Sequence, residues 1–318
     1  MKNELVRVET AVAEGVTLDM VTEAFRLFLR MDVANGDASP DTVRGYLSAV
    51  RSFLAWCHQA ETAPATATAR DILEYRAQLV AYGYKPGTIA HRLSVVRRFY
   101  EALRWHGFRQ DNPADGIQAP RERVMAEDRI RYLETDSLRD LFASIPHDTA
   151  KGRRDRAMIG LMALHGLRGV EIHRASVGDL DLAAAMPTMI ARGKNGDRLV
   201  YLRRDVAAAI AAALEDRAGD LAGDAPLFVS VANRARGERI TRRGVRMVAD
   251  SYLAKSGSQH TGAHVLRHTA ATLALSGGAQ IHQIQAMLGH KDPRTTQRYA
   301  HVIDRAANNP ADRVGVDL

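Results

Sequence analysis

The sequence predicts a mainly helical protein with a small β-hairpin, divided into two domains. At 318 residues the chain is longer than one core of ordinary size requires. Apolar residues recur at spacings of three and four over most of residues 17–106 and again beyond residue 133, which is typical of amphipathic helices. The clearest departure lies at residues 187–202, where two apolar runs flank an Asn-Gly pair that favours a hairpin turn.

The predicted helices fall into two groups, separated by a segment with little apolar periodicity. We expect an all-helical N-terminal domain over residues 1–115, a linker over 116–132 and an α+β domain over 133–318. Helices of the first domain are predicted to begin near residues 17, 40, 72 and 86. In the second domain, hairpin strands at 187–191 and 198–202 and a short strand at 227–229 interrupt the helices.

Composition and charge narrow the choice of partner and compartment. The net charge of +7 arises from 44 Lys and Arg against 37 Asp and Glu, which favours nucleic acid first and an anionic membrane surface second. No apolar run is long enough to span a bilayer and the start of the chain is unlike a signal peptide, so we expect a cytoplasmic protein without a membrane partner. The single cysteine, Cys57, rules out an internal disulfide and is expected to be a buried small hydrophobe.

Basic residues collect on the predicted helices of the first domain. Between residues 85 and 109 the only acidic residue is Glu101. A single charged residue on a helix is usually just solvated, but this asymmetry favours a surface that contacts DNA phosphates. The residues expected to contact DNA are Arg44, Arg51, Lys85, Arg92, Arg97 and Arg98.

Polar residues in apolar helical surroundings mark a candidate site in the second domain. Arg168 follows an apolar helix, His264 and Arg267 open another, and His290 and Tyr299 come after a third apolar run. Two arginines and histidines that converge on one point suit a phosphodiester, because guanidinium groups donate bidentate hydrogen bonds to phosphate oxygens. A phenol, whose ordinary pKa is near 10, becomes a useful nucleophile beside cations and a general base.

Two of these residues have a simpler interpretation that must be weighed. His264 and His268 lie four residues apart, which is also a spacing of zinc ligands on a helix, but position 265 is valine and no third ligand is placed. We therefore expect no metal, and His268 is interpreted as a structural hydrogen-bonding residue. Tyr299 is distinguished from an ordinary core tyrosine by its distance from His290 and by the lack of large apolar residues beside it in the sequence.

The segments that carry these residues resemble the tyrosine recombinase (phage integrase) family, above all its Xer-like and minimal integrase branch. Segments 42–46, 88–93 and 112–114 resemble its core-binding domain, so the resemblance covers nearly the whole chain. In the predicted catalytic domain, the family's motifs are similar to Gly166-Leu167-Arg168 with Glu171, Gly193-Lys194, His264-Val-Leu-Arg-His-Thr269, Leu288-Gly-His290 and Thr295-Thr-Gln-Arg-Tyr299.

The resemblance implies how the phosphate would be attacked and bound. Tyr299 would attack the scissile phosphate and keep the 3′ end of the DNA. Arg168 and Arg267 would bind the non-bridging oxygens, and His290 would add a hydrogen bond to the developing charge. His165 stands before this Gly-Leu-Arg motif where relatives more often have threonine, so we expect the packing of that turn to differ.

The resemblance also implies proton transfers and a supporting residue. Lys194 would protonate the departing 5′-hydroxyl, and His264 would act as a general base toward the tyrosine. Glu171 would hold Arg168 in place without reacting. Two arginines, Arg192 and Arg198, lie on the same hairpin as Lys194. Neither a metal nor any other cofactor is implied, because cationic side chains take the part of a divalent ion.

The function implied is that of a site-specific recombinase. It would cut and rejoin double-stranded DNA at specific recombination sites through a 3′-phosphotyrosine and a Holliday junction, as a homo-tetramer or as a hetero-tetramer with a paralogous recombinase. A topoisomerase-IB-like or telomere-resolving enzyme would use the same chemistry without pairing two sites, and a DNA-binding protein with a degenerate site is disfavoured because all six catalytic positions are filled. Xer-like resolution and mobile-element integration or excision stay open, and the tail from residue 305 is expected either to be disordered or to exchange between protomers.

Overall fold

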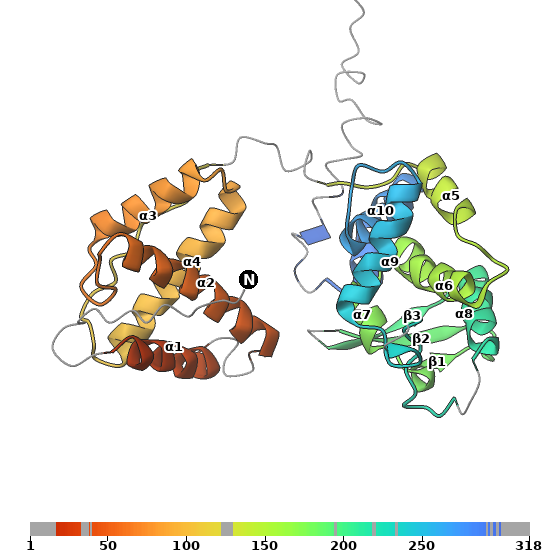
Figure 1. Cartoon of the computed structure of the whole chain (residues 1–318). Coiled ribbons are helices and arrows are strands. Elements are labelled where there is room, and N and C mark those ends of the chain that lie inside the picture. The colour runs from red at the N-terminus through yellow and green to blue at the C-terminus, as the bar shows by residue number, and fades with distance from the viewer. Residues whose placement is uncertain are drawn as a thin grey trace, which may run out of the picture. The chain divides into compact units, whose positions relative to one another are not determined.

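The computed structural model describes residues 17–32, 38, 40–121, 130–193, 196–217, 221–232, 235–290, 292, 295–296 and 299. The chain divides into two compact units, Met1–Arg123 and Val124–Leu318. The described part of the first unit is helical, and the second combines helices with a small sheet (Figure 1). The predicted fold class, mainly helical with a small sheet and two domains, is confirmed. None of the described helices has both the length and the apolar character of a membrane span.

Four helices make up the described part of the first unit: α1 (Leu18–Asp32), α2 (Pro40–Gln59), α3 (Ala69–Ala81) and α4 (Pro86–Trp105). Local chemistry explains where they begin. Thr68 caps α3 by accepting the backbone N–H of Asp71, whose carboxylate in turn accepts the N–H of Thr68. Pro86 occupies the first turn of α4, where its missing N–H is not needed.

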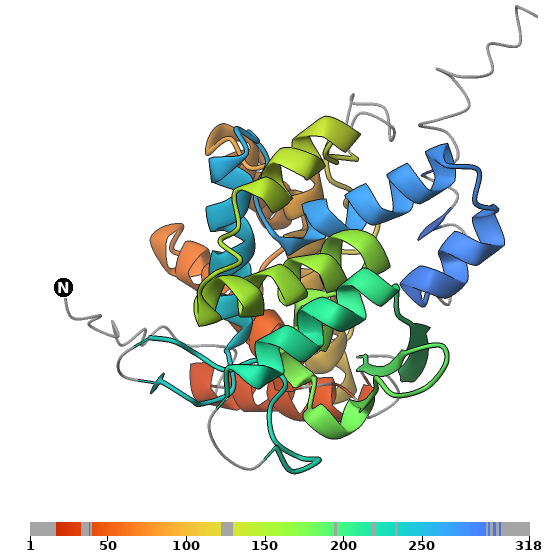
Figure 2. The same cartoon turned by 90° about the vertical axis from the view of Figure 1, so that its right-hand side faces the viewer.

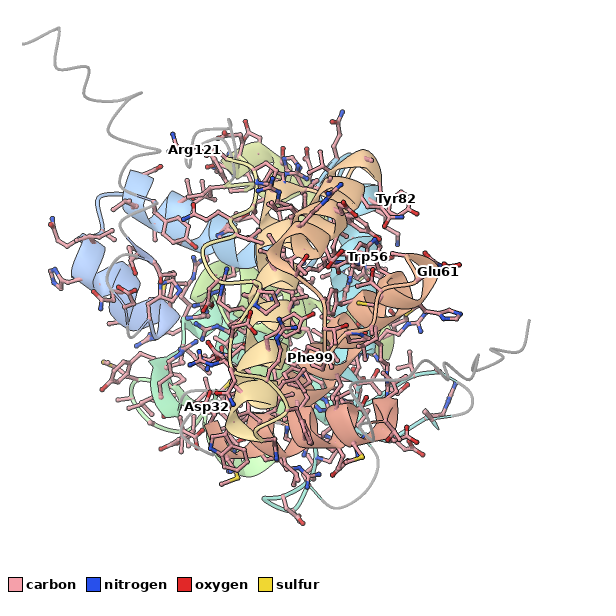
Figure 3. All side chains as sticks on the ribbon, turned by 90° about the vertical axis from the view of Figure 1, so that its left-hand side faces the viewer. Asp32, Trp56, Glu61, Tyr82, Phe99 and Arg121 are labelled. Atoms are coloured by element: carbon pink, nitrogen blue, oxygen red, sulfur yellow. The ribbon has the colours of Figure 1, made fainter. Side chains whose placement is uncertain are left out.

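Aromatic side chains dominate the core of the first unit. Phe99 is fully buried and packs edge-on against Phe25 and Phe53, with ring centroids 5.7 and 6.1 Å away. In Figure 3, Phe99 lies among the helices while the exposed Tyr82 points outward. Cys57 belongs to this core, and burial raises the pKa of its thiol to about 12, so the prediction of a buried and unreactive cysteine is confirmed.

The second unit is built around one helix, α6 (Ala150–His165), that is buried over most of its circumference. It packs against α8 (Arg204–Glu215) and α10 (Ala263–Ser276) (Figure 2). The other described elements of this unit are α5 (Thr135–Ala143), α7 (Gly169–Arg174), the short 3₁₀ helix η4 (Val177–Asp179), α9 (Arg242–Lys255) and α11 (Ile281–Leu288).

The sheet of this unit is a three-stranded antiparallel one among the described residues. Its strands β1 (Leu180–Asp181), β2 (Thr188–Arg192) and β3 (Asp197–Tyr201) pair in chain order. Ile190 lies opposite Leu199 in the β2–β3 hairpin, which confirms the predicted hairpin. The strand predicted at 227–229 is wrong: residues 226 and 229 form only isolated bridges, because the run pairs with two different segments, at Ser176 and at Arg239, for one residue pair each. The C-terminal tail lies outside the described residues.

Candidate active site

Arg168 reaches the site because the chain turns sharply at the end of α6. The helix ends at Gly166, whose φ of 65° is the left-handed conformation that glycine adopts without strain. Leu167 is then buried in the core, and Arg168 immediately precedes α7. The apolar residue thus anchors the turn while the arginine emerges from it, which explains why the Gly-Leu-Arg sequence produces this geometry.

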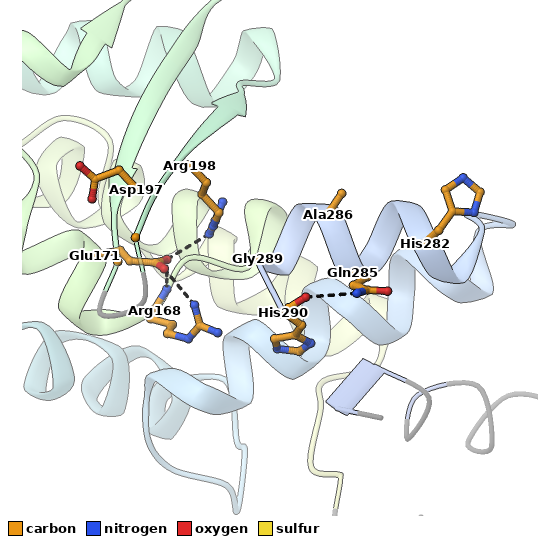
Figure 4. A pocket seen from close by; sticks show the side chains of 11 residues that line it. Arg168, Glu171, Asp197, Arg198, His282, Gln285, Ala286, Gly289 and His290 are labelled. Carbon is orange, nitrogen blue, oxygen red and sulfur yellow. Dashed lines mark hydrogen bonds and ion pairs between the residues drawn. The ribbon is translucent and has the colours of Figure 1, made fainter. Parts of the chain in front are cut away.

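Glu171 holds Arg168 as the sequence predicts, and it also binds a second arginine. Its carboxylate, 1% exposed, accepts the backbone N–H of Arg168 at 2.8 Å and the side-chain Nη1 of Arg168 at 3.0 Å. Arg198 of β3 donates from Nη2 to the other face of this carboxylate at 3.0 Å (Figure 4). A buried carboxylate requires such compensation, so Glu171 and the two guanidinium groups form one charged unit.

Arg267 is the most deeply buried arginine of the site, at 5% exposure. It extends from α10 and donates to the carbonyl oxygens of Gly166 and, at 2.6 Å, of Leu288. Its Nη2 also lies 2.9 Å from Nε2 of His290. Burial, followed by the like charge of Arg168, lowers the pKa of Arg267 to about 10, which still leaves it charged at neutral pH.

His290 follows the second left-handed helix end of the site. Gly289 closes α11 with φ 61°, and His290 comes directly after it. Because a guanidinium can only donate, Nε2 of His290 accepts from Arg267 and its Nδ1, 2.9 Å from Oγ1 of Thr296, carries the proton. The ring orientation is therefore fixed from both sides.

Tyr299 reaches the same helix as Arg267 but bonds to a histidine that was interpreted as structural. Its hydroxyl lies 2.7 Å from Nδ1 of His268, and its side chain is 2% exposed. The expectation that large apolar residues would be absent around it holds only along the chain, because Ile284 and Leu288 of α11 pack on it in space. These neighbours come from another helix, where sequence adjacency gives no signal.

His264, the predicted general base, lies one turn before His268 on α10, with ring centroids 6.4 Å apart. Burial, and then the cations Arg267 and Arg168, lowers the pKa of His264. The neutral ring is therefore favoured at neutral pH, and this is the form that accepts a proton. No hydrogen bond between His264 and Tyr299 is present in the described structure; the phenol is bonded to His268 instead.

A pocket of about 460 Å³ opens beside these groups (Figure 4). Of the predicted site residues, Arg168, Glu171 and His290 line it, and Arg267 is joined to it through His290. Lys194 lies outside the described residues. Arg198, which the sequence placed only as a neighbour on the hairpin, belongs to the wall; the remaining lining comes from Gly193, Gly196, Asp197, His282, Gln285, Ala286 and Gly289.

The unusual residue before the arginine turn, His165, has a definite structural place. It is buried, and its Nε2 accepts the backbone N–H of Arg203 at 3.2 Å. Burial, with a further contribution from Arg203, lowers the pKa of His165 to about 4, so the ring is neutral at pH 7. This hydrogen bond connects the end of α6 to the start of α8. Among the described residues, no three His, Cys, Asp or Glu side chains are grouped to hold a metal ion.

The basic residues predicted to contact DNA differ in how far they are engaged within the first unit. Arg44, Arg51 and Lys85 are exposed. Arg92 stacks over the ring of Tyr84 at 4.3 Å. The other two arginines bond to groups within the unit. Arg97 donates to the carbonyl of Ile117 at 3.0 Å, and Arg98 forms ion pairs with Asp32 at 2.5 Å and Glu101 at 3.1 Å.

Comparison with known proteins agrees with this geometry. The model of the phage integrase family matches residues 131–305, and that of the phage integrase N-terminal SAM-like domain matches residues 26–107. A tyrosine recombinase XerC of Pelobacter propionicus is 33% identical over 287 residues, covering 89% of this chain and 91% of the relative. A tyrosine recombinase XerD of Caulobacter vibrioides is 35% identical over 286 residues, covering 86% and 90%.

Solved structures share the fold at low sequence identity. A lambda integrase dimer bound to a COC′ core site is 16% identical, with a TM-score of 0.69 and coverage of 92% of this chain and 97% of that one. XerH bound to its difH substrate gives a TM-score of 0.65 at 16% identity, covering 92% and 96%. The fold and the site define a DNA breaking-rejoining enzyme of the tyrosine recombinase class. The chain belongs to the phage integrase family, with Xer recombinases among its relatives, and it acts in site-specific DNA recombination.

Proposed function

We propose that this protein recombines two specific DNA sites by forming a covalent 3′-phosphotyrosine through Tyr299. The observation that carries the proposal is the convergence of distant segments: Arg168 and His290 line one pocket, and Arg267 is hydrogen-bonded to His290. Tyr299 is bonded to the same helix that supplies Arg267. Such a set of fixed cations suits a phosphate whose charge grows in the transition state.

In this mechanism the two arginines bind the non-bridging oxygens of the scissile phosphate. Arg168 is held by Glu171 and Arg267 by main-chain carbonyls, so both are oriented before DNA arrives. For His290 to donate to the phosphate, its Nε2 has to leave Arg267 and carry the proton, while Nδ1 accepts from the hydroxyl of Thr296. Because Tyr299 is 2% exposed, its phenol has to leave His268 before it can meet a phosphate in a duplex.

Two proton transfers complete the cleavage step. His264 takes the phenolic proton as Tyr299 attacks phosphorus, and its lowered pKa keeps it in the accepting form. Lys194, which comes between β2 and β3 in the sequence, protonates the 5′-oxygen as its bond to phosphorus breaks. The phosphotyrosine keeps the bond energy, so a 5′-hydroxyl from a second duplex reverses the reaction and reseals the strand.

The assembly that supports this exchange is a tetramer on two double-stranded sites, which passes through a Holliday junction in the cytoplasm. The first unit contributes a basic surface for DNA, with Arg44, Arg51 and Lys85 its most exposed predicted members. Two structural neighbours, one bound to a core site and one to its difH substrate, support a DNA partner. The tyrosine recombinases XerC and XerD among the relatives support recombination as the reaction, whether it serves Xer-like resolution or the integration or excision of a mobile element.

The decisive experiment traps the covalent intermediate on a nicked suicide duplex that carries the protein's own site, selected first by binding from random or genomic DNA. We expect a DNA-linked protein band with the native chain and none with Tyr299→Phe, while the dissociation constant of the DNA complex stays within about threefold because the phenol is not needed for binding. An adduct formed by Tyr299→Phe would overturn the assignment. Relaxation of a supercoiled plasmid without recombination between two cloned sites would identify a topoisomerase instead.

A further inference from the structure

Arg198 occupies a position where the strand pattern calls for an apolar side chain. Along β3 the neighbours Leu199 and Tyr201 are exposed on the outer face, whereas Val200 is buried on the inner one. Alternation places Arg198 on the inner face with Val200, and its side chain is 16% exposed. An arginine facing inward is costly unless its charge and its donors are matched, which points to a specific task.

The contacts of Arg198 connect it to two segments of the proposed active site. Its Nη2 donates to Oε2 of Glu171 at 3.0 Å, while Oε1 of the same carboxylate accepts from Arg168 at 3.0 Å. Glu171 is thus held between two guanidinium groups and presents a different oxygen to each. Without Arg198, the carboxylate of Glu171 would be held only by the backbone N–H and the side chain of Arg168, the residue that it orients, so the direction of Arg168 would be less well defined.

The second contact is with the turn that carries His290. A Cβ atom at Gly289 would lie 2.6 Å from Cδ and 2.8 Å from Nε of Arg198, so the arginine stem lies directly on this glycine's backbone. Nε of Arg198 is buried and has no hydrogen-bond partner among the described residues. The side chain therefore fills the space between the hairpin, Glu171 and the end of α11, as Figure 4 shows.

We propose that Arg198 is a positioning residue for DNA cleavage: through Glu171 it sets the orientation of Arg168, and through its packing on Gly289 it sets the place of His290. This inference rests on the proposed function. It makes the β2–β3 hairpin part of the phosphate site in its own right, in addition to any role of Lys194. An arginine is suited to the task because its planar fork can bind a carboxylate while its stem packs on a backbone, which a lysine ammonium cannot reproduce.

The test measures single-turnover cleavage of the suicide duplex at saturating DNA, together with DNA affinity and thermal unfolding, for Arg198→Met and Arg198→Lys. We expect Arg198→Met to cleave about 100-fold slower with affinity changed less than threefold, because a misplaced catalytic group costs rate more than binding. Arg198→Lys should recover part of that loss. Arg192→Met is the matched control, since Arg192 lies on the same hairpin but pairs with Asp179 at 2.6 Å and is 52% exposed; we expect its cleavage rate to change less than about twofold.

Action through Glu171 is tested by the double variant Arg198→Met/Glu171→Gln. If Arg198 works by orienting Glu171, the double variant cleaves at about the rate of the slower single variant, because the second change removes a support that is already lost. Multiplied losses would mean that Arg198 does not act through Glu171 and would overturn that part of the proposal. A folded Arg198→Lys or Arg198→Met enzyme with the native rate would also overturn it, while an adduct with the native chain would leave the proposed function intact.

Discussion

The two units of this chain differ in what they bury. No charged residue among the described residues of the first unit is buried, and its core is formed by aromatic and aliphatic side chains. The second unit buries five charged residues among those described, Arg154, Asp155, Glu171, Asp179 and Arg267. Burying a charge is unfavourable unless ion-pair or hydrogen-bond partners are supplied. The second unit therefore loses some folding stability because it holds charged side chains in fixed directions. The first unit can serve as a stable carrier of an exposed basic surface.

The comparison is tested most strongly at Arg267. Replacing it by alanine removes the proposed transition-state contact and leaves the carbonyl oxygens of Gly166 and Leu288 without their buried donor. We expect Arg267→Ala to cleave the suicide duplex about 1000-fold slower. Single-turnover cleavage measures this, with Arg267→Lys as the control that keeps a cation but loses the fork. Cleavage within tenfold of the native rate would contradict the role of this buried charge.

A core substitution in the first unit should lower the stability of that unit without slowing DNA cleavage. Phe99→Ala removes a fully buried ring and is expected to lower the free energy of unfolding by about 3–5 kcal/mol. Both tryptophans of the sequence, Trp56 and Trp105, lie in the first unit, so their fluorescence during urea unfolding follows this unit alone. At a temperature where the variant stays folded, its cleavage rate at saturating DNA should match that of the native chain. A large loss of rate there would show that the two units are not separable in this way.

The buried carboxylate of Asp155, to which we assign no catalytic role, tests whether burial of charge in the second unit always serves catalysis. Asp155 is fully buried and accepts from Lys151 at 3.1 Å and from the hydroxyl of Tyr252 at 3.0 Å. Burial, and then the charge of Asp155, raises the pKa of Tyr252 to about 12, which keeps this phenol a donor. We expect Asp155→Asn to destabilise the chain by about 3 kcal/mol, because it leaves the buried Arg154 without its carboxylate.

Circular dichroism during urea unfolding measures this loss, and the cleavage rate of the folded variant should be unchanged. Tyr252→Phe is the milder control, since it removes one hydrogen bond worth about 1 kcal/mol. A slower cleavage step in folded Asp155→Asn would mean that this network extends into the active site, and burial of charge would then mark function throughout the unit.

The smallest expected effect is a dependence of stability on pH that belongs to His165. Its folded pKa of about 4 lies below the ordinary value of 6.5, so the unfolded chain binds a proton that the folded chain refuses. The stability it contributes is present above pH 6.5 and is lost as the pH falls toward 4. At pH 5 the loss is about 2 kcal/mol. The native chain should therefore lose more stability than His165→Gln between pH 7.5 and 5, and equal losses would contradict the assignment.

Most of the fold could be predicted from local patterns in the sequence. Apolar spacing predicted the helices of both units, and the Asn-Gly pair predicted the β2–β3 hairpin, because these signals depend on residues close together in the chain. The strand expected at 227–229 failed for the same reason: an apolar run records burial, but a strand also requires a distant partner along its length. Motif spacing named the site residues, of which Arg168, Glu171 and His290 line one pocket.

The sequence did not predict which side chains pair when their residues lie far apart along the chain. Arg198 and Glu171 are 27 residues apart, and His268 and Tyr299 are 31 apart, so no periodicity connects them. The signal for Arg198 was present in its alternation with Val200 on β3, where an inward arginine breaks the apolar pattern. For the burial of Tyr299 there was no local signal, because the residues that cover it belong to α11.

The left-handed turns at Gly166 and Gly289 have a consequence for which substitutions would inactivate this enzyme. Each ends a helix just ahead of a side chain that we propose to bind phosphate, and a Cβ atom at either would overlap a neighbour, Leu288 at 2.5 Å or Arg198 at 2.6 Å. An alanine at either position would have to adopt the left-handed conformation and displace that side chain. We therefore expect a single added methyl group, with every charge still in place, to disturb the turn that carries Arg168 or His290.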